Sequence, residues 1–311
     1  MTRYLFGVFL AAFLLTPRAE ALNCTFAIST LDFGDVDTLG GGAVDRTATL
    51  SINCTSVTLG TVRICPNIGA GSGGSSGAVR YMRNPANAPL EFSLYTDTGT
   101  TPWGSIEQAL LGTPPTIDLN TSLFGSISTT RTIYGRVSAN QQTAATGHFS
   151  SMFTSAYSKI SYSDLTLFNC LTLASPVAVP FEVKADVQPN CLVTADNINF
   201  GVHGVLKTNV DAAGAVNVRC TPGTSYSVGL NGGLANAAPT ARQMKLGAAV
   251  VTYGLYLNTQ RTQPWSQTVG QIASGTGTGL VQGLPVYGRV PAQTTPGAGV
   301  YNDTVVATVT Y

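Results

Sequence analysis

The distribution of apolar and polar residues along the chain predicts short β-strands. Residues 181–187 alternate strictly, with Phe, Val, Ala and Val separated by Glu, Lys and Asp, and residues 305–311 alternate in a similar way. A period of two places one face of a strand against a core and the other in solvent. Only residues 105–111 favour a short helical turn. Because Gly and Pro separate the apolar runs throughout, we expect an all-β fold.

The chain carries one pattern twice. Each copy opens on a cysteine, continues to a Phe-Gly pair and then reaches a second cysteine, with Cys24 and Cys54 in the first copy and Cys191 and Cys220 in the second. A Pro-Trp pair and a Tyr-Gly-Arg-Val segment follow in each copy, and each ends on an alternating strand. So many landmarks in one order indicate a duplication. We expect two tandem immunoglobulin-like β-sandwiches.

The N-terminus has the features of a secretory signal peptide. Arg3 precedes an apolar run over residues 5–15, and an Ala-Glu-Ala segment follows at residues 19–21. The run is shorter than a membrane-spanning helix requires, and the small residues are typical of a cleavage site. We therefore expect a signal peptide over residues 1–21, an N-terminal domain over 22–178 and a C-terminal domain over 179–311.

The repeat selects among the possible disulfides. An even number of cysteines behind a signal peptide favours disulfide bonds. The cysteines at equivalent places give the pairs Cys24–Cys54 and Cys191–Cys220, and elimination leaves Cys65–Cys170 for the first copy.

Charge contributes little to the predicted function. Charged residues make up 10% of the chain and the net charge is +1. No stripe of Lys or Arg is present to bind nucleic acid or an anionic membrane, so we expect neither partner.

The opening Cys, Phe-Gly and Cys, the Tyr-Gly-Arg-Val segment, and the terminal Tyr-x-Asp-Thr-Val of residues 301–305 continuing to Tyr311 resemble the spore coat protein U domain family. That family includes subunits of archaic chaperone–usher pili. The resemblance implies a subunit that lacks the last strand of its sandwich. A periplasmic chaperone covers the gap first, and the next subunit then fills it with an N-terminal strand at the outer-membrane usher.

The two copies differ at their ends. The second copy stops at the strand bearing Val305, Ala307, Val309 and Tyr311, so we expect this strand to border an acceptor groove. For the first copy, two segments are candidates to close the sandwich: residues 165–173, pinned by the Cys65–Cys170 bond, and residues 181–187. We prefer residues 181–187 as the first strand of the second domain. Because only two residues precede Cys24 after cleavage, the chain has no donor strand to offer and is expected at a pilus tip.

Extra residues in the first copy mark a candidate surface for adhesion. The segment between Trp103 and Tyr134 is longer than its counterpart, and it contains apolar residues among Gly, Pro and Ser, namely Ile106, Leu110, Leu111, Leu123 and Phe124. Such residues are suited to contact an abiotic or host surface, or alternatively cap the core. Phe149, Met152 and Phe153, and the glycine-rich residues 69–77, are weaker candidates.

No set of residues indicates catalysis, a cofactor or a metal. His148 and His203 lie at non-equivalent places, and the Gly-x-Ser-x-Gly match at residues 73–77 falls in a glycine-rich loop rather than a strand-to-helix turn. We therefore expect a tip adhesin that supports attachment and biofilm formation and is not an enzyme. The alternatives are an exported coat protein of the same fold and, behind it, a secreted hydrolase or carbohydrate-binding module.

Overall fold

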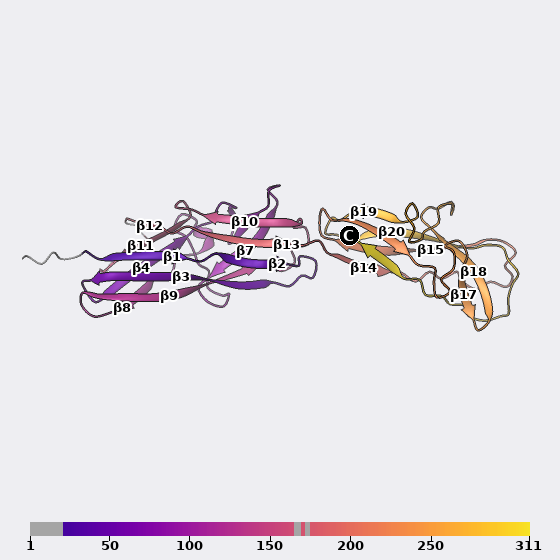
Figure 1. Cartoon of the computed structure of the whole chain (residues 1–311), viewed down its shortest axis with the longest axis horizontal. Coiled ribbons are helices and arrows are strands. Elements are labelled where there is room, and N and C mark those ends of the chain that lie inside the picture. Colours follow the sequence, from indigo (N-terminus) through magenta and orange to yellow (C-terminus); the bar gives the residue numbers. More distant parts are fainter. Residues whose placement is uncertain (1–20, 165–168, 172–174) are drawn as a thin grey trace, which may run out of the picture.

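The computed structural model describes residues 21–164, 169–171 and 175–311. It shows two β-structured units placed end to end, the first from indigo to magenta and the second from orange to yellow (Figure 1). The expected all-β class is confirmed. Within the described residues the only helical element is the 3₁₀ turn η1 (Ala109–Leu111). The predicted signal peptide lies almost wholly outside the described residues.

The first unit has two sheets. The larger contains, in spatial order, β1 (Asn23–Ile28), β3 (Val44–Val57), β9 (Gly125–Val137), β7 (Pro89–Tyr95), β6 (Val79–Arg83), β10 (Gly147–Phe153), β13 (Phe181–Val187) and β2 (Leu31–Val36), with β5 (Ser75–Ser76) paired to β6. The smaller contains β12 (Val177–Ala178), β11 (Ser158–Ser163), β4 (Thr61–Ile68) and β8 (Ile117–Asn120).

The second unit repeats this order with fewer strands. One sheet contains β14 (Cys191–Ala195), β15 (Val210–Cys220), β20 (Gln282–Val290), β18 (Ala249–Tyr256) and β17 (Arg242–Leu246). The other contains β19 (Ala273–Thr276), β16 (Ser225–Leu230) and β21 (Ala307–Thr310). These strands correspond to β1, β3, β9, β7 and β6, and to β8, β4 and β11, of the first unit.

The preferred assignment of residues 181–187 to the second domain is wrong. Strand β13 pairs antiparallel with β10 over its whole length and parallel with β2, so it belongs to the sheet of the first unit. Figure 1 shows it lying between these two strands and running toward the second unit. The boundary expected at residues 178 and 179 therefore moves to the short connection between Val187 and Cys191. The rival segment, residues 165–173, lies mostly outside the described residues.

Each unit has its own core. The larger cluster of buried side chains is built from the sheets of the first unit, and a smaller cluster from those of the second. Three disulfides join Cys24 to Cys54, Cys65 to Cys170 and Cys191 to Cys220, which are the pairs that the sequence predicts. Cys24 and Cys54 face each other across β1 and β3, as Cys191 and Cys220 do across β14 and β15.

A buried arginine anchors the tryptophan of each copy. The guanidinium of Arg80 donates hydrogen bonds to the carbonyl oxygens of Ile68, Gly69 and Trp103, and that of Arg242 to those of Leu230, Asn231, Pro239 and Trp265. Burial lowers the pKa of Arg80 to about 9, so it remains a cation at neutral pH. Satisfied buried donors of this kind fix the hairpin that carries each tryptophan.

Candidate functional site

Strand β13 fills a groove along the first unit. Its four inward side chains, Phe181, Val183, Ala185 and Val187, are at most 5% exposed, whereas the three residues between them are half-buried. The ring of Phe181 stacks on Phe153 of β10, with centroids 4.4 Å apart. The strand therefore supplies a row of apolar side chains that closes the core between β10 and β2.

The second unit contains the two borders of the same groove. Lys245 of β17 forms an isolated bridge with Asn302, as Arg83 of β6 does with Ser150 of β10. This register matches Tyr301, Asp303 and Val305 to the inward residues of β10, namely Phe149, Ser151 and Phe153. On the other border, Ile198 and Phe200 correspond to Leu31 and Phe33 of β2 by the shared Phe-Gly pattern.

No strand of the described residues pairs between these two borders of the second unit. The consequence is visible in the exposure of the border residues. Leu31, Phe33, Phe149 and Phe153 are all 0% exposed in the first unit. Their counterparts Ile198, Phe200, Tyr301 and Val305 are only partly buried. We call the strip between residues 198–200 and residues 299–311 the unpaired strip.

The predicted edge strand lies along this unpaired strip. Residues Ala307 to Thr310 form β21, which pairs on one side with β16, while its first-unit counterpart β11 also pairs with β12 on the other side. The inward residues Val305, Ala307 and Val309 are half-buried, and Tyr311 is 56% exposed. The edge of β21 that corresponds to the β12 side of β11 therefore has no strand partner in the described part of the chain.

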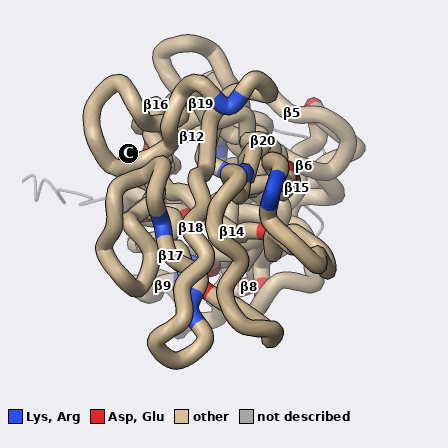
Figure 2. Tube along the Cα trace, turned by 90° about the vertical axis from the view of Figure 1, so that its right-hand side faces the viewer, with Lys and Arg blue, Asp and Glu red and all other residues tan. Residues whose placement is uncertain are grey.

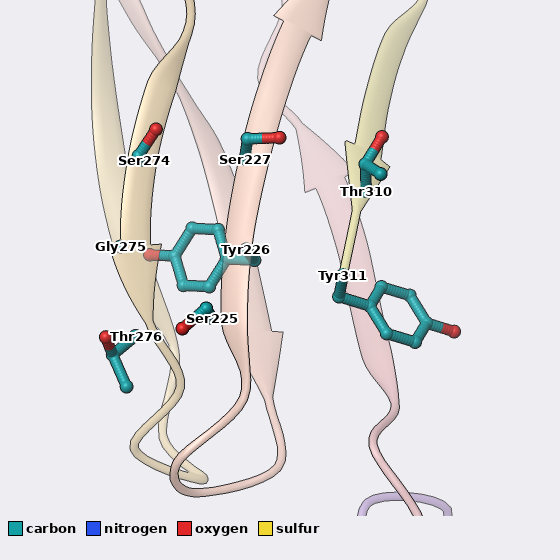
Figure 3. A pocket seen from close by; sticks show the side chains of 8 residues that line it. All are labelled: Ser225, Tyr226, Ser227, Ser274, Gly275, Thr276, Thr310 and Tyr311. Carbon is teal, nitrogen blue, oxygen red and sulfur yellow. The ribbon is translucent and has the colours of Figure 1, made fainter.

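A shallow surface pocket lies across β19, β16 and the end of β21 (Figure 3). Tyr226 of β16 stands opposite Tyr311 in the register of β21, and its ring points at Gly275 of β19, while the Tyr311 ring turns away. In the first unit, Tyr162 occupies the place of Tyr311 and packs on Phe26 at a centroid distance of 5.6 Å. Tyr162 is half-buried, whereas Tyr311 is 56% exposed.

A polar pair lies beside the unpaired strip. Phe200 packs against Tyr253, with ring centroids 5.9 Å apart, and the Tyr253 hydroxyl donates a 2.7 Å hydrogen bond to Asp303. Burial, together with the adjacent Asp303 carboxylate, raises the pKa of Tyr253, so it stays protonated. Asp303 also accepts hydrogen bonds from the backbone N–H groups of Leu234 and Thr304, which fixes the residues that follow.

The residues of the predicted adhesive loop lie at different places in the structure. Leu123 and Phe124 are 68% and 71% exposed, and Leu59, which the sequence did not single out, is 55% exposed beside them. The Phe124 N–H donates to the carbonyl of Val57, so the turn that carries Phe124 adjoins the turn that carries Leu59. They lie where β3 ends and β9 begins, at the end of the first unit farthest from the second unit (Figure 1). We call Leu59, Leu123 and Phe124 the distal apolar tip.

The other residues of the predicted loop lie elsewhere. Leu111 is 1% exposed, which agrees with the alternative that residues of this loop cap the core, and Ile106 is half-buried. Leu110 is 74% exposed but lies on η1, beside the Trp103 hairpin rather than the distal apolar tip. Of the weaker candidate, Phe149 and Phe153 are fully buried, and only Met152 is exposed.

Chemical sites are not apparent in the described residues. His148 pairs with Asp186 at 3.0 Å on an exposed surface, and no group of His, Cys, Asp and Glu has the arrangement of a metal site. Searched over those same ranges, the chain has no helix that is long and apolar enough to cross a membrane. Figure 2 shows the Lys and Arg positions at this end of the described chain spaced apart along the backbone, with few Asp and Glu positions among them.

Comparison with known proteins agrees with the duplicated sandwich. The model of the Spore Coat Protein U domain matches residues 10–155 and again residues 177–308. The chain belongs to the spore coat protein U domain family. A curated member, Protein U of Myxococcus xanthus, is 33% identical over 127 residues, covering 37% of this chain and 71% of Protein U.

A solved chaperone–usher structure shows the same fold. The crystal structure of the CsuC–CsuE chaperone–tip adhesion subunit pre-assembly complex from archaic chaperone–usher Csu pili of Acinetobacter baumannii matches with a TM-score of 0.52 and 18% identity. The match covers 93% of this chain and 100% of that chain. CfaE, the adhesive subunit of CFA/I fimbria of enterotoxigenic Escherichia coli, matches with a TM-score of 0.36 and 8% identity, covering 90% and 92%. This spore coat protein U chain thus has the fold of chaperone–usher subunits.

Proposed function

We propose that this chain is the two-domain tip subunit of a chaperone–usher pilus, and that it mediates attachment and biofilm formation. The carrying observation is the contrast between the units: β13 pairs between β10 and β2 in the first, while the second presents the same borders with no strand of the described residues between them. An extended segment of another chain then completes the second unit by strand addition.

The physical need for a partner follows from exposure. Fully burying one Val or Phe side chain contributes about 1.5–3 kcal/mol, so the three such residues of β13 together contribute several kcal/mol to the first unit. A strand of similar composition would contribute as much to the second. An unpaired strand edge beside a partly exposed core also invites aggregation unless it is covered. A periplasmic pilus chaperone first, and the next pilin subunit later at the outer-membrane usher, would provide the cover.

Placement at the cell surface accords with the chemistry of the chain. Three disulfides suit passage through an oxidising periplasm. The family and the resemblance to a chaperone–tip subunit complex support the same route. In this proposal, the self-completed first unit is the adhesin domain, and its distal apolar tip points away from the pilus rod to contact an abiotic or host surface.

Strand addition is tested on the full mature chain with a synthetic peptide of residues 177–187, because this segment fills the equivalent groove. We expect hydrogen exchange of residues 299–311 to slow and the unfolding transition of the second unit to rise with peptide concentration. The matched control is the same peptide with Asp in place of Val183, which would bury a charge and should not bind. Unchanged exchange and melting at saturating peptide would overturn the proposal.

A separate test addresses adhesion. The triple variant Leu59→Ser, Leu123→Ser and Phe124→Ser changes exposed residues only, so the fold should remain. We expect pili carrying this variant to lose attachment to plastic while subunit assembly continues. Immunogold labelling should mark filament ends; labelling along a whole surface would instead favour the coat-protein alternative.

A further inference from the structure

One arginine of the second unit lies in a site built by four surrounding groups. The Arg261 Nε donates to the carbonyl of Gly288 at 3.0 Å, and Nη1 donates to the carbonyl of Thr259 at 2.8 Å. Nη1 also lies 3.1 Å from Asp211 Oδ2, and the guanidinium carbon is 5.9 Å from the centroid of the Tyr287 ring. The Arg261 side chain is only 13% exposed, so the site encloses it.

The first unit has the same groups around the equivalent position. Asp45 pairs with Arg136 as Asp211 pairs with Arg289, in the same strand register and with the same two hydrogen bonds. Tyr95 faces Tyr134 as Tyr256 faces Tyr287. In these strand pairings, Gly135 takes the place of Gly288, whose carbonyl binds Arg261.

The residue that fills the site differs between the copies. The hairpin that carries Arg261 carries Gly99 in the first unit, and both residues have positive φ, 59° and 116°. Glycine supplies no side chain, and a surface pocket is found there instead, lined by Asp45, Tyr95, Thr98, Gly99, Tyr134 and Gly135 among others. The Arg136 guanidinium lies next to Gly99 but remains bonded to Asp45.

We propose that this pocket of the first unit binds the guanidinium of an arginine side chain presented by a partner polypeptide. The planar guanidinium can donate hydrogen bonds to a carboxylate and a backbone carbonyl at once while its face lies on a tyrosine ring. A lysine ammonium can bind one of these acceptors but cannot reproduce the planar arrangement of donors that binds both. The site lies where β3 begins and β9 ends, whereas the distal apolar tip lies where β3 ends and β9 begins.

Neighbouring charges set how tightly the pocket holds a cation. Asp45 is the carboxylate of the lining, and hydrogen bonding to Arg136 lowers its pKa, so it is ionised at neutral pH. Arg136 neutralises part of this charge, as Arg289 does beside Asp211, where Arg261 is nevertheless held. Arg46, whose counterpart in the register is Ala212, adds a second repelling cation at the rim.

The test titrates the full mature chain with N-acetyl-arginine methylamide and, in parallel, with the lysine analogue, following backbone NMR shifts. We expect saturable shifts around Asp45, Tyr95 and Tyr134 and roughly tenfold tighter binding of the arginine probe, because lysine cannot make the second charge-assisted hydrogen bond at the same time. Arg46→Ala should tighten binding severalfold by removing a like charge. Gly99→Arg should abolish binding by filling the pocket in cis.

Two variants of matched chemistry complete the experiment. Asp45→Asn should weaken the arginine probe by roughly tenfold, whereas Asp211→Asn in the second unit should leave the affinity unchanged. Melting curves of all variants report whether both units remain folded. The proposal is overturned by absence of saturable binding in both wild type and Arg46→Ala, by equal affinity for both probes, or by unaltered affinity in Asp45→Asn.

Discussion

The placement of β13 makes one substitution especially informative, Val183→Ala. Val183 is 0% exposed and lies between Ser151 of β10 and Leu31 of β2. Alanine removes two methyl groups, which costs about 1.6 kcal/mol in transfer free energy, plus a contribution from the cavity that remains. We expect a total loss of about 2–3 kcal/mol from the free energy of unfolding of the first unit alone.

The assay is thermal unfolding of the full mature chain with hydrogen exchange to assign each transition to a unit. For a unit of this size, the expected loss lowers the melting temperature by roughly 5–10 °C. Exchange in β2 and β10 should accelerate, while exchange in β14 to β21 should not change. The matched control is Lys184→Ala, whose outward side chain pairs with Asp32 at the surface and whose loss should cost less than about 1 kcal/mol.

The reasoning is refuted if Val183→Ala lowers the transition of the second unit, because β13 would then serve that unit. It is also refuted if both variants have the same small effect, because an inward strand residue cannot be as dispensable as an exposed one.

Three further predictions concern stability. Replacing Cys65 and Cys170 by Ser opens a loop of 105 residues and should lower the stability of the first unit by roughly 4 kcal/mol in urea titrations, with the second unit unaffected. Arg242→Met should leave buried carbonyls without a hydrogen-bond donor and destabilise the second unit by about 3 kcal/mol, whereas Arg80→Met should destabilise the first unit. If exchange experiments assign these effects to the opposite units, the duplication is contradicted. Hydrogen bonds from Arg136 and Arg289 lower the pKa of Asp45 and Asp211 below the unfolded value near 4. The stability that these two ion pairs contribute is therefore complete above about pH 4 and is lost as the pH falls further. Urea midpoints measured from pH 7 to pH 3 should decrease less in Asp211→Asn than in the wild type.

The expectation that failed shows the limit of pattern reading. Residues 181–187 show a strict alternation, and the strand they predict is present, yet alternation does not say which sheet receives the strand. The segment stands between two copies and is compatible with either. Its assignment depends on pairing with β10 and β2, and both of these strands lie far from it in the sequence. In the same way, apolar residues close in sequence separated into Leu111, buried, and Phe124, exposed.

The sequence alone determined the β-structure, the duplication and the three disulfides, because periodicity and repeated landmarks are local properties that survive any arrangement of the strands. Only the tertiary structure decided which groove is filled, which apolar side chains reach the distal end, and that Gly99 stands where Arg261 lies in the other copy. These are contacts between segments far apart in the chain, and their free energy depends on burial and register, which no local pattern encodes.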